Sequence, residues 1–297
     1  MAEGSTVSPS PPQAPEGPLV GAAWLQENLD HPRLRVLDVR GRHPSSELPH
    51  AKRAEYEVAH LPGAVFVDWE RDFVDADDPV PVQIAAAEAF AARAGELGVG
   101  DGDLVVTYDD YYGIFAARLA WAFRLHGAEA RVLDGGWRTW RDEGRPVDAR
   151  AAAPDPARFT PRPRPYLRRT LIEVEAARAR GAELVDARPR HLFLGEEGVP
   201  NTGHIPGSHC LPYQELVDGA TGLWAAPEAV ARLARDAGID PDRPPRELIA
   251  TCGSGVSATV ALLSLERIGV HAAGVYDGSF NEWSADSGRP VEFGRPS

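Results

Sequence analysis

The chain has 297 residues, of which 31 are Lys or Arg and 44 are Asp or Glu, so its formal net charge is −13. A surface this acidic repels phosphate backbones and anionic lipids, which excludes nucleic acid and membranes as expected partners. The two cysteines are too few for a disulfide framework or a structural zinc site. We therefore expect a cytoplasmic protein of two domains with reduced thiols and no metal.

Two proline-rich segments divide the chain. Residues 1–17 are rich in proline and poor in apolar side chains, which predicts a disordered tail. A second such stretch covers residues 149–166, where the prolines are incompatible with a helix interior or a central strand. We interpret it as a stiffened linker between one domain at 18–148 and another at 167–297.

The two predicted domains repeat one another. A His-Leu-Pro-Gly turn at 60–63 in the first copy corresponds to a His-Ile-Pro-Gly turn at 204–207 in the second. The histidine of the first turn lies 49 positions before Asp109, and that of the second lies 48 positions before Cys252. Agreement in both order and spacing indicates an internal duplication.

Short apolar runs alternate with amphipathic stretches in both copies. Runs bounded by polar or glycine residues predict buried strands at 35–39, 104–108, 184–187 and 248–251. Helical spacing of apolar residues predicts helices at 85–97, 116–126, 171–180, 227–237 and 257–268. This alternation predicts an α/β fold in which each copy has a mostly parallel sheet flanked by helices. Binding sites in such sheets lie beyond the carboxyl ends of the strands.

Cys252 directly follows the predicted strand at 248–251 and opens a Cys-Gly-Ser-Gly-Val-Ser loop at 252–257. The two glycines of this loop allow a tight turn that brings backbone N–H groups together. Such a concavity, with a helix N-terminus beside it, stabilises a thiolate, which is the nucleophilic form of cysteine. Cys252 is therefore the candidate nucleophile, with a buried structural cysteine as the alternative. Cys210 is better explained as a small buried apolar residue.

A cysteine between a strand and a helix also occurs in protein tyrosine phosphatases. Those enzymes need an arginine six positions after the cysteine to bind the phosphoryl oxygens. Here that position holds Ala258, and the first arginine after the loop is Arg267. Phosphatase chemistry is therefore disfavoured, and an attack on sulfur fits the loop better.

The repeated turns, the loop at 252–257 and an Asp-Gly-Ser-Phe-Asn-Glu-Trp segment at 277–283 resemble the tandem-domain rhodanese-like sulfurtransferases. The resemblance implies two rhodanese-like domains of which only the second is active, and Asp109 indeed stands where the first copy would need its cysteine. Loops of the form Cys-Gly-Ser-Gly-Val-Thr are typical of 3-mercaptopyruvate sulfurtransferases. Loops of the form Cys-Arg-Lys-Gly are typical of thiosulfate sulfurtransferases. The loop of this chain therefore favours 3-mercaptopyruvate, with thiosulfate as the alternative donor.

The same resemblance implies a reaction. A sulfane sulfur would pass from the donor through a persulfide on Cys252 to cyanide or to a thiol, such as thioredoxin or a low-molecular-weight thiol. No metal or organic cofactor is implied. The alternative from another class is a non-catalytic rhodanese binding module, which the intact thiol disfavours because a scaffold does not need it.

The resemblance also suggests roles for individual residues. Ser254 would relay a proton or polarise the carbonyl of the donor. The first domain would add an acid, for which Glu70 and Asp68 are the candidates, with solvated loop carboxylates as the alternative. Each copy has one of these turn histidines, His60 in the first and His204 in the second. We therefore expect both to hydrogen-bond their turns. The remaining loop residues would surround the reacting sulfur: Gly253, Gly255, Val256 and Ser257.

A carboxylate on the donor is matched best by the fork of an arginine. Where the family has an arginine for this purpose, the chain has Leu192, and the nearest substitutes are Arg190 and Arg188. Arg40 occupies the place of Arg188 in the first copy, so a structural ion pair is the alternative for Arg188. Arg190 has no such counterpart and is the preferred clamp.

Overall fold

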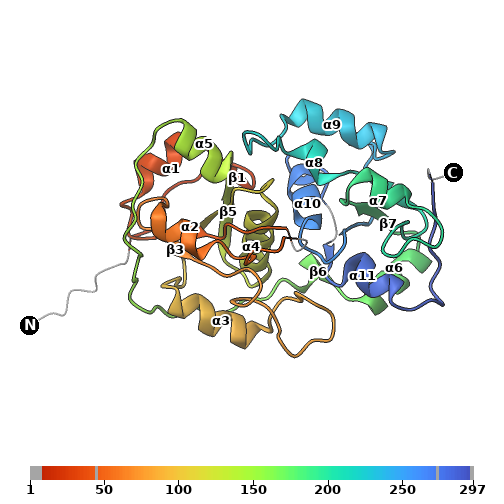
Figure 1. Ribbon diagram of the computed structural model, residues 1–297, viewed down its shortest axis with the longest axis horizontal. Helices are drawn as coiled ribbons and strands as arrows, with labels where there is room; N and C mark the ends of the chain where they lie inside the picture. The colour runs from red at the N-terminus through yellow and green to blue at the C-terminus, as the bar shows by residue number, and fades with distance from the viewer. Residues whose placement is uncertain (1–8, 44–45, 272–273, 295–297) are drawn as a thin grey trace, which may run out of the picture.

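The computed structural model describes residues 9–43, 46–271 and 274–294. Two lobes follow one another along the chain, and they meet where α4 (Ile114–Leu125) packs against α10 (Ala258–Glu266) (Figure 1). Each lobe has a five-stranded sheet with parallel neighbours throughout. The expected α/β fold, with a parallel sheet in each copy, is confirmed.

The two sheets have the same strand order. The first runs β1-β5-β4-β2-β3 and the second β6-β10-β9-β7-β8. The strands of the first sheet are β1 (Leu19–Val20), β2 (Leu34–Asp38), β3 (Val65–Phe66), β4 (Leu104–Tyr108) and β5 (Glu129–Leu133). Those of the second are β6 (Arg168–Arg169), β7 (Glu183–Asp186), β8 (Ser208–Cys210), β9 (Leu248–Thr251) and β10 (Val275–Tyr276).

Helices cover both faces of each sheet. The other helices of the first lobe are α1 (Ala22–Asn28), α2 (Arg53–Val58), α3 (Ala87–Glu96) and α5 (Gly136–Asp142). A 3₁₀ turn, η1 (Pro165–Leu167), leads into the second lobe. There the helices are α6 (Leu171–Ala179), α7 (Arg190–Leu194), α8 (Tyr213–Leu216), α9 (Pro227–Asp236) and α11 (Ser279–Ser284). None of the helices in the described ranges combines the length and apolarity that crossing a bilayer requires.

The elements with clear periodicity were predictable, and the short ones were not. The strands expected at 104–108 and 248–251 have those bounds, and the other expected strands and helices differ from the observed ones by one or two residues at their ends. Sequence patterns missed the two-residue strands β1, β3, β6 and β10, because two residues carry no period. They also missed β5, in which Glu129 and Arg131 interrupt the apolar run.

One hydrophobic cluster runs through both lobes. It contains Leu119 of α4 and Leu262 of α10, together with Val105 of β4, whose side chain faces this inner layer. Separate clusters fill the outer face of each sheet, one around Trp140 and the other around Trp283. Since the largest cluster crosses from one lobe to the other, we infer that the two lobes fold into a single body.

The proline-rich stretch runs along the first lobe without helix or strand from 151 to 164. Ala157 N donates to Gly95 O at 2.9 Å, and Arg162 N donates to His126 O at 2.8 Å. Gly127 has a φ of +94°, and a Cβ there would lie 2.6 Å from Arg162 O, so only glycine permits this approach. In the expected tail, residues 1–8 lie outside the described residues, and Gln13 O accepts a hydrogen bond from Trp24 Nε1 at 3.1 Å.

His126, at the end of α4, is buried beneath this stretch. Its ring stacks on Phe90 with 4.1 Å between the ring centroids. Burial, with a further contribution from the charge of Arg168, lowers the pKa of His126 to about 4. A histidine buried in this way destabilises the folded state once solution pH permits its protonation in the unfolded chain.

We expect the free energy of unfolding to fall as the pH is lowered from about 6.5 to about 4. Over this range the unfolded chain binds a proton at His126 and the folded chain does not, which amounts to a loss of about 3 kcal/mol. Urea unfolding at a series of pH values measures this loss. His126→Leu should flatten the dependence between these pH values, and an unchanged slope in that variant would contradict the assignment.

Candidate active site

Cys252 lies at the carboxyl end of β9, where the chain turns into α10, and is 2% exposed. Its backbone is fixed against the start of α11. Cys252 N donates to Ser279 Oγ at 3.1 Å, and Cys252 O accepts from Phe280 N at 2.9 Å. Asn281 N also donates to Gly253 O at 2.9 Å. These three hydrogen bonds hold the backbone of the first two loop residues, Cys252 and Gly253, in place.

The corresponding loop of the first copy holds the carboxylate of Asp109. Oδ1 accepts hydrogen bonds from Tyr111 N at 2.8 Å and Gly113 N at 3.0 Å. Oδ2 accepts from Phe115 N and Ala116 N, both at 2.9 Å. Burial raises the pKa of Asp109 to about 7, and the N–H groups oppose this by favouring the carboxylate. The loop is thus a cradle of N–H groups around a side-chain acceptor.

In the second copy Cys252 takes the place of Asp109 directly after the strand, and no carboxylate is present there. Ser254, Val256 and Ala258 follow Cys252 at the offsets at which Tyr111, Gly113 and Phe115 follow Asp109: two, four and six residues. Within the described part of the chain, the backbone N–H groups of these three residues donate to no protein acceptor. By analogy with the N–H groups that bind Asp109, these three are available to an anion on the side chain of Cys252.

A cavity of about 190 Å³ opens beside Cys252, with walls from both lobes. The first lobe contributes a largely aromatic wall: His43, Trp69, Ile114 and Phe115. The second lobe contributes, besides the loop, Arg188, Leu192, Tyr213 and Asn281. The cavity is large enough for a small organic donor and combines an apolar wall with hydroxyl, amide and guanidinium groups.

Most of the loop residues named from the sequence line this cavity together with Cys252: Gly253, Ser254, Val256 and Ser257. Gly255 lies behind them and has a φ of +77°. A Cβ at Gly255 would lie 2.5 Å from Asp277 O, so the close approach of the loop to β10 requires glycine. At Gly253 the nearest atom to such a Cβ is 3.9 Å away, which leaves room for a side chain.

Arg188 lines the cavity but is also held by a buried ion pair. Its Nη2 lies 2.6 Å from Asp186 Oδ2 and donates to Gly203 O at 2.6 Å. Its Nη1 makes a long bond of 3.4 Å to Asn201 O. Arg40 pairs with Asp38 in the same way in the first copy, at 2.8 Å. The ion pair with a strand-end aspartate is thus present in both copies. In the second copy the arginine of this pair also borders a cavity that contains a thiol.

Arg190 begins α7 and points elsewhere. Its Nη2 lies 2.8 Å from Glu215 Oε1, and its side chain is 53% exposed. It is not among the residues that line the cavity of Cys252, although its neighbours Pro189 and Leu192 are. Reaching a donor in the cavity would therefore require Arg190 to exchange Glu215 for the donor carboxylate.

The two candidate acids of the first lobe lie beside the cavity rather than on its wall. Glu70 Oε1 is 2.7 Å from His50 Nδ1. Asp68 Oδ1 accepts from Glu70 N at 3.1 Å. Between them in sequence, Trp69 is the residue that lines the cavity.

The histidines of the two turns are buried against backbone carbonyls away from the cavity. His60 Nδ1 lies 2.6 Å from Tyr56 O, and His204 Nδ1 lies 2.9 Å from Phe193 O. Cys210 is buried on β8, and burial raises the pKa of its thiol to about 11. None of the three is placed for chemistry with Cys252.

Tyr213 and Asn281 are cavity residues that sequence reasoning missed. Asn281 could have been found, since it follows β10, whose carboxyl end lies at the same sheet edge as that of β9. Tyr213 carries no such signal, because its place depends on how α8 packs against α10. Burial raises the pKa of Tyr213, so its hydroxyl stays protonated and can donate. Within the described residues, no group of three His, Cys, Asp or Glu side chains is arranged to hold a metal ion.

We expect Asp109→Ala to destabilise the protein by roughly 3 kcal/mol or more, because four backbone N–H groups, two of them buried and two partly buried, lose their acceptor. Asp110→Ala is the matched control. It removes one ion pair, with Lys52, rather than four backbone hydrogen bonds, and should therefore cost less. Urea unfolding of both variants gives the comparison, and equal losses would show that the cradle does not depend on its carboxylate.

Comparisons with known proteins agree with this geometry. The rhodanese-like domain model matches residues 21–143 and 170–286, which are the two copies. The 3-mercaptopyruvate sulfurtransferase of Mus musculus is 36% identical over 277 residues, covering 89% of this chain and 91% of that protein. The thiosulfate sulfurtransferase of Cricetulus griseus is 35% identical, with the same coverage.

A solved structure is similar as well. The crystal structure of SseA from Escherichia coli, described as a 3-mercaptopyruvate sulfotransferase, superposes with a TM-score of 0.79. It shares 31% sequence identity and covers 89% of this chain and 99% of that one. With two matched domains and relatives similar over nearly their whole length, the chain belongs to the tandem rhodanese-like sulfurtransferases.

Proposed function

We propose that this sulfurtransferase moves sulfur from 3-mercaptopyruvate to a thiol or cyanide through a persulfide on Cys252. The observation that carries the proposal is the cradle of N–H groups around Cys252, which the first copy fills with the carboxylate of Asp109. A thiolate and a persulfide anion are both negatively charged groups that such a cradle stabilises.

The reaction has two displacements. The Cys252 thiolate attacks the donor sulfur, the carbon–sulfur bond breaks, and pyruvate leaves as its enolate, which then takes up a proton. The acceptor thiolate next attacks the outer sulfur of the persulfide, which restores the Cys252 thiolate and leaves the acceptor as a persulfide. With cyanide the product is thiocyanate. This is covalent catalysis that needs no group other than the thiol to carry the sulfur.

Ser254 is the proposed source of the proton, because its side chain belongs to the wall of the cavity. Tyr213, also on that wall, is a second hydroxyl that stays protonated. Glu70 and Asp68 lie outside the wall, so either would act through an intervening water or side chain. Their part in the reaction is thus secondary to that of Ser254.

The loop supports 3-mercaptopyruvate over thiosulfate. Positions 253 and 254 carry glycine and serine, so no cation of the loop faces the attacked sulfur. A dianion such as thiosulfate gains more from adjacent cations than a donor with one carboxylate does. Thiosulfate is kept as the second candidate, since a relative of nearly equal identity is named for it.

For the donor carboxylate we propose Arg188 as the first partner, with Arg190 as the alternative. Arg188 lines the cavity, and among the described residues its Nη1 has a single long hydrogen bond, to Asn201 O. A carboxylate could replace that bond without disturbing the pair with Asp186. Arg190 would first have to leave Glu215.

The compartment and the acceptor are part of the same proposal. Both cysteines are free, which suits a reducing cytoplasm, although a relative from Arabidopsis thaliana is named as mitochondrial. Thioredoxin or a low-molecular-weight thiol would be the acceptor there.

The proposal is tested by mass spectrometry of the protein after treatment with 3-mercaptopyruvate. We expect one added sulfur atom on the peptide that contains Cys252, and none on the peptide that contains Cys210. Cys252→Ser should abolish transfer with the fold intact, because a hydroxyl is a far weaker nucleophile at neutral pH. Cys210→Ser should retain transfer, and loss of activity in that variant alone would overturn the assignment.

The carboxylate partner is tested with three arginine variants. Arg188→Ala and Arg40→Ala each break a buried ion pair, so both should lose about 3–5 kcal/mol of stability. Only Arg188→Ala should also raise the Michaelis constant for 3-mercaptopyruvate, lowering kcat/KM by about 10- to 150-fold. If Arg190→Ala raises the Michaelis constant and Arg188→Ala behaves like Arg40→Ala, the clamp is Arg190.

A further inference from the structure

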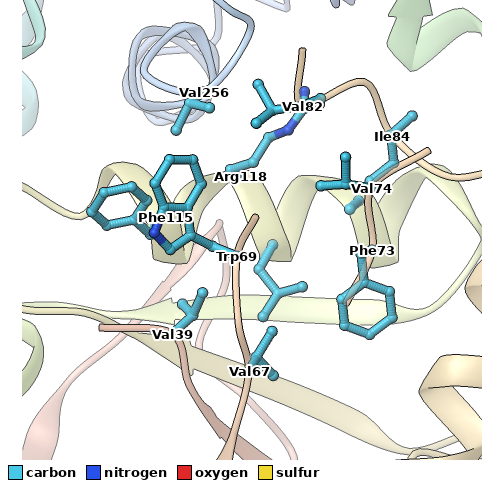
Figure 2. A pocket seen from close by; sticks show the side chains of 12 residues that line it. Val39, Val67, Trp69, Phe73, Val74, Val82, Ile84, Phe115, Arg118 and Val256 are labelled. Carbon is cyan, nitrogen blue, oxygen red and sulfur yellow. The ribbon is translucent and has the colours of Figure 1, made fainter. Parts of the chain in front are cut away.

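Arg118 belongs to α4 of the first lobe but bonds to the second. Its Nη2 lies 2.5 Å from Asp277 Oδ1, and its Nη1 donates to Gly255 O at 3.3 Å. Nη2 also donates to Val82 O at 3.0 Å. Figure 2 shows Arg118 extending from the helix toward Val82, with Val256 of the catalytic loop beside it, around a cavity of about 30 Å³.

Asp277, the ion-pair partner of Arg118, is itself held in place. Asp277 is 1% exposed, its Oδ2 accepts from Ile84 N at 3.2 Å, and the same oxygen lies 2.8 Å from Arg168 Nε. Gly255 is confined between two groups, because Asp277 O stands where its Cβ would be and Arg118 holds its carbonyl. The peptide between Gly255 and Val256, which carries one N–H of the cradle, is thereby held from the first lobe.

The duplication supplies an internal comparison. Asp134 of the first copy corresponds to Asp277, and it accepts from Trp224 N of the second lobe at 2.9 Å. Within the described residues Asp134 has no ion-pair partner in bonding distance, whereas Asp277 has two. The position of α10 that corresponds to Arg118 holds Ala261, nine residues after Cys252. The arginine therefore reaches only toward the loop that carries a thiol.

We propose that Arg118 is a positioning residue for the reaction, through which the first lobe sets the reactivity of Cys252. By bonding Gly255 O and Asp277 together, it keeps the loop in the conformation that directs the N–H groups of Ser254 and Val256 at the sulfur. This rests on the proposed role of Cys252 as the nucleophile. Without Arg118, the carbonyl of Gly255 is free to turn, and the cradle stabilises the thiolate less well.

The test measures the thiol itself rather than turnover. In the Cys210→Ser background Cys252 is the only cysteine, so its rate of alkylation by iodoacetamide against pH reports the thiolate fraction. Arg118→Met should displace this profile and slow alkylation at neutral pH by about tenfold, because the loop then stabilises the thiolate less well. Arg118→Lys keeps a charge beside Asp277 but cannot hold both acceptors, so it should restore stability more fully than it restores the profile.

Arg124→Met is the matched control. Arg124 lies on the same helix and also joins the lobes, with its Nη2 2.8 Å from Glu266 Oε2, but it does not touch the loop. Its loss should leave the alkylation profile unchanged. Unfolding curves are recorded for all three variants, and Arg118→Lys decides the matter if Arg118→Met does not fold.

A profile in Arg118→Lys identical to that of the parent protein would overturn the proposal. So would equal shifts in the Arg118 and Arg124 variants. Failure of the proposed function is seen separately, as absence of the persulfide on Cys252 in the parent protein, because alkylation needs no sulfur donor.

Discussion

The packing of α4 against α10 is the contact on which the other features of the site depend. Nearly every residue of both helices is buried, with Arg124 and Glu266 as exceptions at the two C-terminal ends. A helix that is apolar on all sides must be covered on all sides, and each copy supplies the cover for the other. Because each helix follows directly after its loop, this contact brings the loop of Asp109 and the loop of Cys252 to the same seam. The same contact places aromatic side chains of the first lobe on the wall of the cavity beside Cys252.

The two loops stand in equivalent places after β4 and β9 but differ in chemistry. In the first, a carboxylate accepts four backbone hydrogen bonds and completes the structure internally. In the second, the N–H groups of Ser254, Val256 and Ala258 have no protein acceptor among the described residues, whereas that of Thr259 donates to Val256 O at 3.3 Å. Leaving buried N–H groups unpaired is costly. When an anion forms on the sulfur, these N–H groups gain an acceptor, and the free energy lost in the resting state is regained. The site then binds the charged state more tightly than the resting state, which is what catalysis by differential binding requires.

The charged residues of the two copies can be compared in the same way. Arg40 and Arg188 hold the ends of equivalent strands by ion pairs with Asp38 and Asp186. This repeated pair is structural in origin, and only in the second copy does it border a cavity with a thiol. Arg118 has no equivalent in the other copy. It belongs to the copy without a thiol and donates a hydrogen bond to the loop that has one. The first copy thus contributes a contact to the loop of the second.

The sequence alone determined the duplication, the α/β fold and the central strands, and it predicts Cys252 as the nucleophile, because each of these depends on local order, spacing and periodicity. The loop of Cys252 was recognisable for the same reason, since a strand, two glycines and a helix are adjacent in the chain. The tertiary structure alone decided which distant side chains meet that loop. Tyr213, Trp69 and Arg118 reach it through the packing of helices and turns whose relative placement leaves no periodic trace in the sequence. Secondary structure follows from neighbours along the chain, but a site between two lobes follows from how their surfaces fit.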